Sequence, residues 1–184
     1  MTLEWLFECW RLEVSNKKKK GSRIGLFSNI VRRARKDNNL RFLFSFRLAQ
    51  YLNSKGGLRA ARARKMQQKL NLKYAVDIDI SASIAPGFRI AHLPGVVITG
   101  NANIGRNFFI RQNTTIGIKT LGLDHYALNI GDNVSVGANS CIIADHLTIG
   151  DNVTIGAMTL VTKDIASDCT FYNKREAVTQ STLT

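Results

Sequence analysis

The sequence predicts a mainly β fold, a triangular parallel β-helix that follows an α-helical extension. Between Val97 and Lys163 an aliphatic residue recurs every six positions, and a glycine follows many of them, as in Ile104-Gly105. A period of six fits neither an α-helix nor the simple alternation of a strand. It fits a short strand plus a turn, repeated so that three units close one triangular coil. A β-sandwich with strands at chance spacing is the alternative, and the long run of matches disfavours it.

The residues before the repeat predict helices separated by turn signals. The first helix has one apolar stripe made by Leu3, Leu6, Phe7 and Trp10, and the basic run before Gly21-Ser22 ends it. Asp-Asn-Asn and Gly-Gly then punctuate the chain as caps or turns. Four helices are expected: residues 3–14, a basic helix from about Ser28 to the turn at 37–39, an apolar helix over 40–52 and a basic helix over 58–70.

The positive charge belongs to this extension. The chain has a net charge of +13, and residues 1–75 contain 19 Lys and Arg against four acidic residues. Two interpretations compete: a helical collar that joins subunits and keeps its charges solvated, or a contact of residues 1–70 with an anionic membrane surface. Nucleic acid is not an expected partner, because the charge alone would suffice but no recognition motif appears.

Counting by sixes assigns every aliphatic position of the repeat to one of three walls. Wall one takes Ile90, Ile110, Val136 and Ile155; wall two takes Ile78, Ile98, Ile116, Ile142 and Val161; wall three takes Ile84, Ile104, Ile130 and Ile149. In this register Phe88 and Phe108 lie one above the other. Departures from six mark loops at the corners: eight residues from Ile90 to Ile98, fourteen from Ile116 to Ile130 and seven from Ile142 to Ile149.

Several segments of the repeat resemble a known family. The Ile-Gly repeat looks like that of the left-handed β-helix (hexapeptide-repeat) acyltransferases. Within them, Val76-Asp77-Ile78, His92, the interruption at 117–128 and Thr162-Lys163-Asp164-Ile165 resemble the serine acetyltransferase branch, which includes polysaccharide O-acetyltransferases. The resemblance implies a left-handed coil, a homotrimer or hexamer, acetyl-CoA as co-substrate and no metal. It also implies coenzyme contacts from Gly117, Ala138, Ala157, Thr162 and Lys163.

His92 and Asp77 are the first candidate catalytic residues. His92 follows wall one on the corner that leads to wall two, and Asp77 lies on that corner one coil earlier. Adjacent strands are about 4.8 Å apart, so we expect the Asp77 carboxylate to accept a hydrogen bond from His92. This would fix the imidazole tautomer and leave the other nitrogen free to remove a proton from an attacking alcohol.

His125 is the other catalytic candidate, and it lies on a different corner. It sits in the long interruption between walls two and three. One subunit cannot easily bring it to His92, but neighbouring subunits of a trimer can share one cleft. We interpret His146, at the one-residue bulge, as a surface residue without a catalytic role.

The acceptor follows from two residues that differ from the resembled pattern. Serine acetyltransferases have an Asp directly before the first catalytic His and an Arg two before the second, and here Ala91 and Leu123 stand there. We therefore expect a sugar hydroxyl of a capsular, extracellular or O-antigen polysaccharide as the acceptor, with a lipid-linked glycan as one form. Serine O-acetyltransferase is the alternative. A β-helix zinc protein of the carbonic-anhydrase type and a non-catalytic polyanion-binding trimer are more distant readings.

Composition completes the expectations. Three cysteines, Cys9, Cys141 and Cys169, lack metal-type spacing and favour a reduced compartment. No signal peptide and no apolar run long enough to span a bilayer occurs. We expect a cytoplasmic protein, with association at the inner face of the cell membrane only if the extension contacts lipid rather than forming a collar. The expected division is a basic α-helical extension at 1–74, an acetyltransferase β-helix at 75–166 and a tail at 167–184.

Overall fold

The computed structural model describes residues 1–15 and 23–174. Its helices are α1 (Leu3–Cys9), the π-helix η1 (Trp10–Ser15), α2 (Arg23–Lys36), α3 (Asn38–Asn53) and α4 (Gly57–Tyr74). α2 begins before the expected start near Ser28, and α4 continues past residue 70. The Asp37 carboxylate caps α3 by accepting hydrogen bonds from the N–H groups of Asn39 and Leu40, which confirms the predicted cap. The basic run at 17–20 and the break at 21–22 lie outside the described residues.

Short strands occupy the positions that the six-residue count assigns. They are β1 (Asp77–Ile78), β2 (Ser83–Ile84), β3 (Arg89–Ile90), β4 (Val97–Ile98), β5 (Ala102–Ile104), β6 (Phe109–Ile110), β7 (Thr115–Gly117), β8 (Ala127–Ile130), β9 (Ser135–Val136), β10 (Cys141–Ile143), β11 (His146–Ile149), β12 (Thr154–Ile155), β13 (Leu160–Val161) and β14 (Thr170–Phe171).

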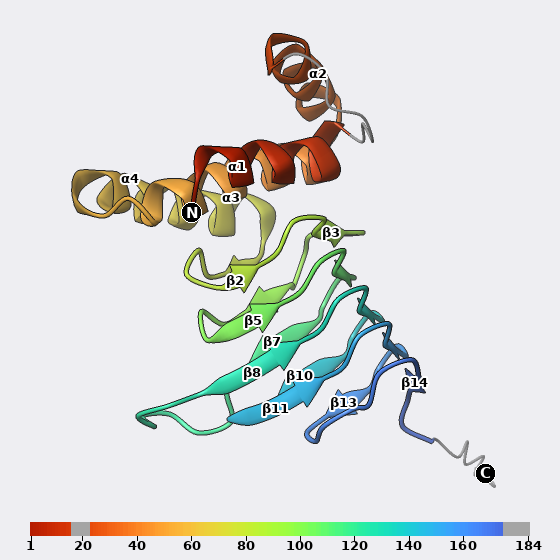
Figure 1. Cartoon of the computed structure of the whole chain (residues 1–184). Coiled ribbons are helices and arrows are strands. Elements are labelled where there is room, and N and C mark those ends of the chain that lie inside the picture. Colours follow the sequence, from red (N-terminus) through yellow and green to blue (C-terminus); the bar gives the residue numbers. More distant parts are fainter. Residues whose placement is uncertain (16–22, 175–184) are drawn as a thin grey trace, which may run out of the picture.

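The strands form three parallel sheets, which are the three predicted walls (Figure 1). Wall two is β1-β4-β7-β10-β13, wall three is β2-β5-β8-β11, and wall one is β3-β6-β9-β12-β14. The observed partners match the predicted register residue by residue, with Ile98 paired to Ile78 and Ile116, for example. The chain therefore coils through walls two, three and one in turn, as a parallel β-helix.

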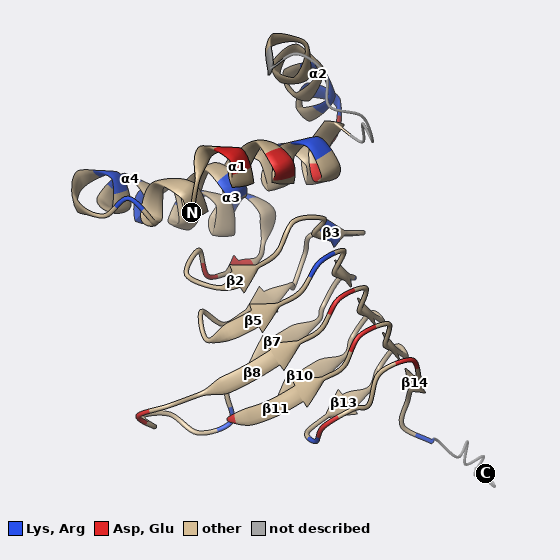
Figure 2. Ribbon diagram, viewed as in Figure 1, with Lys and Arg blue, Asp and Glu red and all other residues tan. Residues whose placement is uncertain are grey.

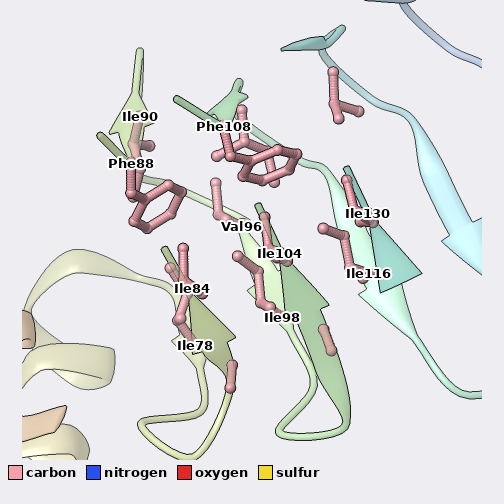
Figure 3. Packing of buried hydrophobic residues seen from close by; sticks show 14 of the residues in the cluster. Ile78, Ile84, Phe88, Ile90, Val96, Ile98, Ile104, Phe108, Ile116 and Ile130 are labelled. Atoms are coloured by element: carbon pink, nitrogen blue, oxygen red, sulfur yellow. The ribbon is translucent and has the colours of Figure 1, made fainter. Parts of the chain in front are cut away.

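The aliphatic positions fill the interior of this prism, as Figure 3 shows for the first coils. Wall residues such as Ile78, Ile110 and Ile142 are fully buried. The rings of Phe88 and Phe108 stack with centroids 6.0 Å apart, which confirms the predicted pair. Phe46 of α3 packs edge-on against Phe88 at 6.4 Å, so the apolar core continues without a break from the prism into the helices.

The corners use asparagine and glycine for different reasons. Asn107, Asn133 and Asn152 stack at one corner with φ near +57°, and their amides hydrogen-bond from coil to coil. The glycines that follow aliphatic residues, unlike these asparagines, do not have a positive φ. A Cβ on Gly105 would lie 2.6 Å from the carbonyl carbon of Gly131 in the next coil, so these glycines allow the backbones to approach closely.

Helices seal the N-terminal end of the prism, where no coil precedes the first one. The buried Arg47 side chain donates to the carbonyls of Ile84 and Ala85, and Gln50 donates to the carbonyl of Ala82. The buried Glu13 carboxylate accepts from the N–H groups of Gly87 and Phe88. Glu13 and Arg47 also form a two-bond ion pair at 2.6 and 2.9 Å. Edge groups that would otherwise lack partners are thereby satisfied.

The C-terminal end of the prism extends beyond the boundary we expected at residue 166. β14 pairs with β12 in wall one, and Ile165 forms a bridge with Ile149 of wall three. The segment that we expected to be a tail therefore begins by completing one more coil, and residues 175–184 lie outside the described part.

Charge divides the molecule as the sequence indicates. Lys and Arg colour α2, α3 and α4, whereas acidic residues are frequent at the prism corners (Figure 2). Among the described helices, none is both long and apolar enough to cross a bilayer.

Candidate functional site

His92 lies on an exposed bulge between β3 and β4, at the corner that joins walls one and two. The bulge is fixed on both sides. The amide of Asn39, at the start of α3, donates to the carbonyls of Ile90 and Ala91 at 3.1 and 2.7 Å. Gly95 closes the bulge with φ +73°. The sequence thus presents the imidazole to solvent on a rigid backbone.

The expected hydrogen bond between Asp77 and His92 does not form. The Asp77 carboxylate accepts from the side-chain amide of Asn71, on α4, at 3.0 Å, and the described residues contain no ion pair or hydrogen bond between Asp77 and His92. The register explains the difference. Asp77 lies beneath Val97 rather than beneath the bulge, because the two extra residues separate His92 from the strand above Asp77. Both side chains are nevertheless exposed at the same corner.

His125 lies in an exposed loop, residues 118–126, at the corner between walls two and three. Asp145 anchors the beginning of this loop by accepting hydrogen bonds from the N–H groups of Lys119 and Thr120 at 3.0 and 2.8 Å. The Thr120 bond, with a smaller contribution from Lys119, holds the pKa of the Asp145 carboxyl below its ordinary value. The Tyr126 hydroxyl donates to the Thr120 carbonyl at 2.9 Å and closes the loop on itself.

The structure brings His146 next to His125, which the sequence analysis did not foresee. Their ring centroids are 5.9 Å apart. His146 pairs with Ala127, two residues after His125, so the strand register places one imidazole beside the other. That register was available from the sequence, but we interpreted His146 as a bulge residue. No group of three or more His, Cys, Asp or Glu side chains suited to a metal occurs in residues 1–15 and 23–174.

The five candidate coenzyme-binding residues divide between the same two corners. Ala138 and Ala157 follow β9 and β12, above His92, and Ala138 stacks beneath Met158 through a backbone hydrogen bond of 2.8 Å. Gly117 ends β7, and Thr162 and Lys163 follow β13, all on the corner of the His125 loop. Gly117 and Ala138 are half-buried and the other three are exposed. Small residues lie on one corner and a cation lies on the other. A long, phosphate-bearing ligand could contact both sets only where the two corners of different copies come together.

A basic aromatic group on wall one was also missed. Arg89 and Arg111 place their guanidinium carbons 4.9 and 4.5 Å from the centroid of the Phe109 ring. The two arginines are separated in sequence, and each reads as an ordinary surface charge. Only the pairing of β3 with β6 shows that they share one ring.

Searches for relatives return acetyltransferases. No family model matches the chain. Serine acetyltransferase 1, chloroplastic, of Arabidopsis thaliana is 39% identical over 105 residues, which is 57% of this chain and 33% of the relative. A protein of Escherichia coli K12 named as the colanic acid biosynthesis acetyltransferase WcaB is 38% identical over 73 residues, 39% of this chain and 44% of the relative. The chain thus spans about a third of the length of the first relative and under half of the second.

Solved structures give the fold. Serine acetyltransferase isoform 3 of Entamoeba histolytica, in complex with cysteine, superposes with a TM-score of 0.73 over 98% of this chain and 61% of that one, at 23% identity. The Neisseria gonorrhoeae serine acetyltransferase in complex with serine gives 0.68 over 91% and 64%, at 24% identity. The three parallel sheets and the N-terminal helices therefore have the architecture of serine acetyltransferases, a left-handed parallel β-helix with an α-helical extension.

Proposed function

We propose that this chain is an acetyl-CoA-dependent O-acetyltransferase. The observation that carries the proposal is His92, an exposed imidazole on a backbone fixed by Asn39 and Gly95, at a corner of a fold that serine acetyltransferases share. The curated relatives of the matched segment, which are named acetyltransferases, support it independently.

In this proposal His92 is the general base. It removes the proton of the acceptor hydroxyl as the new C–O bond forms and the thioester C–S bond breaks, and it returns that proton to the departing sulfur. Acetyl-CoA supplies the acetyl group already activated as a thioester. Asp77 is the orienting residue, and this role requires its carboxylate to exchange the Asn71 amide for the imidazole. No covalent acetyl-enzyme is needed.

We propose that a homotrimer completes the site, with wall two facing the threefold axis. The outward residues of wall two above its first strand are Val97, Thr115, Cys141 and Leu160, and Leu160 is 53% exposed. Wall three instead presents Ser83, Asn103, Asn129 and Thr148. The more apolar wall is the better interface.

This orientation joins the two histidine corners. Wall two lies between them, so placing it at the axis brings the His92 corner of one subunit against the His125 corner of its neighbour. The exposed leucines of the 118–126 loop, Leu121 and Leu123, then reach across the contact. The coenzyme candidates Ala138 and Ala157 would face Gly117, Thr162 and Lys163 of the neighbour along one groove. Leu160→Asp should dissociate the trimer, which sedimentation would detect, and Thr154→Asp on wall one is the matched control.

Two acceptors have specific support. L-serine is favoured by the serine acetyltransferases among the relatives and solved structures, which outnumber polysaccharide enzymes. A sugar hydroxyl is favoured by Ala91 and Leu123, which cannot bind the amino and carboxylate groups of serine, and by the likeness to the colanic acid acetyltransferase. The comparisons support L-serine at least as well as a sugar.

An acetyl-transfer assay tests the proposal. Release of coenzyme A thiol is measured with acetyl-CoA and a panel of purified glycans or L-serine. His92→Ala should lower the rate by at least about 100-fold, the lower range for a general base. Arg106→Ala, an exposed residue on another corner, serves as the control. Wild-type rates from His92→Ala, or no transfer to any acceptor, would contradict the proposed function.

We also propose that the basic extension contacts anionic lipid at the inner face of the cell membrane. α2 presents Ile24 and Phe27 to solvent, 86% and 49% exposed, beside the exposed Arg32 and Arg35. An apolar stripe flanked by arginines suits an anionic interface. The protein should float with vesicles of phosphatidylcholine and phosphatidylglycerol but not with phosphatidylcholine alone. Ile24→Ser with Phe27→Ser should abolish flotation, whereas Ser at the exposed Leu72 of α4 should not.

A further inference from the structure

Arg89, Phe109 and Arg111 form a cationic surface group on wall one, which we name the arginine pair with its ring. Phe109 lies directly above Arg89 in the sheet, and Arg111 is two residues further along the same strand direction. Both guanidinium groups lie within 5 Å of the ring centroid, at 4.9 and 4.5 Å. The half-buried ring therefore restricts the positions of two long, charged side chains, so that little further ordering is needed to bind a ligand.

Among residues 1–15 and 23–174, neither guanidinium of the pair has an anionic partner. The ion pairs of the described residues join Arg47 to Glu13 and Arg106 to Glu8. Arg111 donates only long bonds, to the Ser135 hydroxyl at 3.4 Å and the Val136 carbonyl at 3.3 Å. Two neighbouring cations without a carboxylate form a site that an external anion can neutralise.

The strands that carry the pair lead to the backbone of the candidate base. Ile110 is the strand partner of Ile90, and the N–H of Ala91 donates to the Ile110 carbonyl at 3.0 Å. Arg111 therefore stacks over Ala91, the residue that directly precedes His92. Arg89 lies three residues before His92 on the outer face of the same wall.

We propose that the arginine pair binds a carboxylate of the acceptor and holds its hydroxyl at His92. This inference rests on the proposed acetyltransferase function and narrows its substrate class to carboxylate-bearing acceptors. The carboxylate can come from a uronic acid residue of a glycan or from an amino acid such as L-serine. It narrows our expectation of a sugar hydroxyl, because the carboxylate partner that is missing at Leu123 is replaced by cations on wall one.

The position of the pair favours the acceptor over the coenzyme. The candidate for the nucleotide phosphates, Lys163, follows the strand of the fifth coil, whereas Arg111 belongs to the second. Three coil spacings separate them by about 14 Å along the prism axis. A coenzyme that extends from His92 toward Lys163 follows the corner of Ala138 and Ala157, whereas the arginine pair lies on the outer face of wall one.

The test uses acceptors matched for charge and the arginine variants. A glucuronate-containing oligosaccharide is compared with its glucose counterpart, and L-serine with L-serinamide, in the transfer assay. The Arg89→Gln, Arg111→Gln double variant should raise KM for the carboxylate acceptor by about 10- to 100-fold. Its KM for acetyl-CoA, its kcat and its rate with the neutral counterpart should stay within about twofold of the wild-type values. Arg106→Gln, an exposed arginine on another corner, is the control.

The outcomes separate the two proposals. If the wild type prefers the glucuronate oligosaccharide to its glucose counterpart, or L-serine to L-serinamide, the preferred compound identifies the source of the carboxylate. Equal use of charged and neutral acceptors by the wild type, or a rise of KM for acetyl-CoA alone in the double variant, would overturn the inference. If no acceptor is acetylated, equilibrium binding of the same four compounds is measured. Carboxylate binding that the double variant loses would then sustain the arginine site while the acetyltransferase function fails, and absence of such binding would refute the site.

Discussion

Replacing Arg47 with Met should destabilise the protein strongly, because it strands a buried charge. Both side chains of the Glu13–Arg47 pair are fully buried. Burial alone would lower the pKa of Arg47, but the charge and hydrogen bond of Glu13, together with Cys9, outweigh it and raise that pKa. Removing one partner of a buried pair costs about 3–5 kcal/mol. For a chain of this size the Tm should fall by roughly 6–20 °C.

The same variant leaves part of the prism edge without donors. The carbonyls of Ile84 and Ala85 each lose a hydrogen bond to Arg47, of 2.7 and 3.0 Å. The variant should therefore show faster amide hydrogen exchange in the first coil than in the upper coils. Unfolding is followed by circular dichroism at one fixed protein concentration, since self-association would otherwise shift the Tm.

Two further variants make the argument refutable. Arg106→Met breaks the exposed pair with Glu8, whose side chains are 48% and 36% exposed, and should cost at most about 1 kcal/mol. Adding Glu13→Gln to Arg47→Met removes the stranded charge and should recover part of the loss. If Arg47→Met is as stable as Arg106→Met, or if the double variant is less stable than Arg47→Met alone, the account of the sealed end is wrong.

Three other outcomes follow from the geometry. Gly95→Ala should cost about 1–3 kcal/mol and lower kcat, since its φ is +73° and an added Cβ would meet Asn113 of the next coil, whereas Gly57→Ala at the start of α4, with φ +54° and open space, should leave kcat unchanged. Cys9 should resist iodoacetamide in the folded protein, because burial raises the pKa of its thiol to about 12, while the half-buried Cys169 should react. The pKa of the Asp145 carboxyl is lower in the folded protein than its ordinary value. The ionised carboxylate therefore stabilises the fold at pH values above the ordinary pKa, and this stabilisation is lost as the pH falls through the folded value. Proteolysis of the 118–126 loop should therefore rise only in that acidic window, and in the Asp145→Asn variant the dependence should disappear.

The walls could be predicted residue by residue because they depend on a local rule. A strand of two to four residues and a turn repeat along the chain, so an inward Ile at one level determines the next, and departures from six locate the loops of His92 and His125. The corner that each candidate residue occupies follows from the same count. Only the aliphatic signal was followed, so Thr170–Phe171 of the last coil was missed.

Side-chain directions could not be obtained by counting. The coil on which Asp77 lies was predicted correctly, but its carboxylate accepts a hydrogen bond from Asn71 of α4. The position of that helix on the prism cannot be obtained from the six-residue period. The buried Glu13–Arg47 pair likewise lies on helices whose charges look like a solvated face in the sequence. Contacts between the helices and the prism determine both features, and the six-residue period carries no information on either.

The sealed end has a consequence for how the chain can be shortened. Glu13, Arg47 and Gln50 occupy strand edges that would otherwise be free to recruit another molecule. A fragment beginning near residue 75 would expose the floor of the first coil, while the last coil presents a parallel edge of matching pitch. Copies of such a fragment should stack head to tail into fibres, because this contact is heterologous and does not close. The helices that cover the first coil thus prevent that end of the repeat from pairing with another copy.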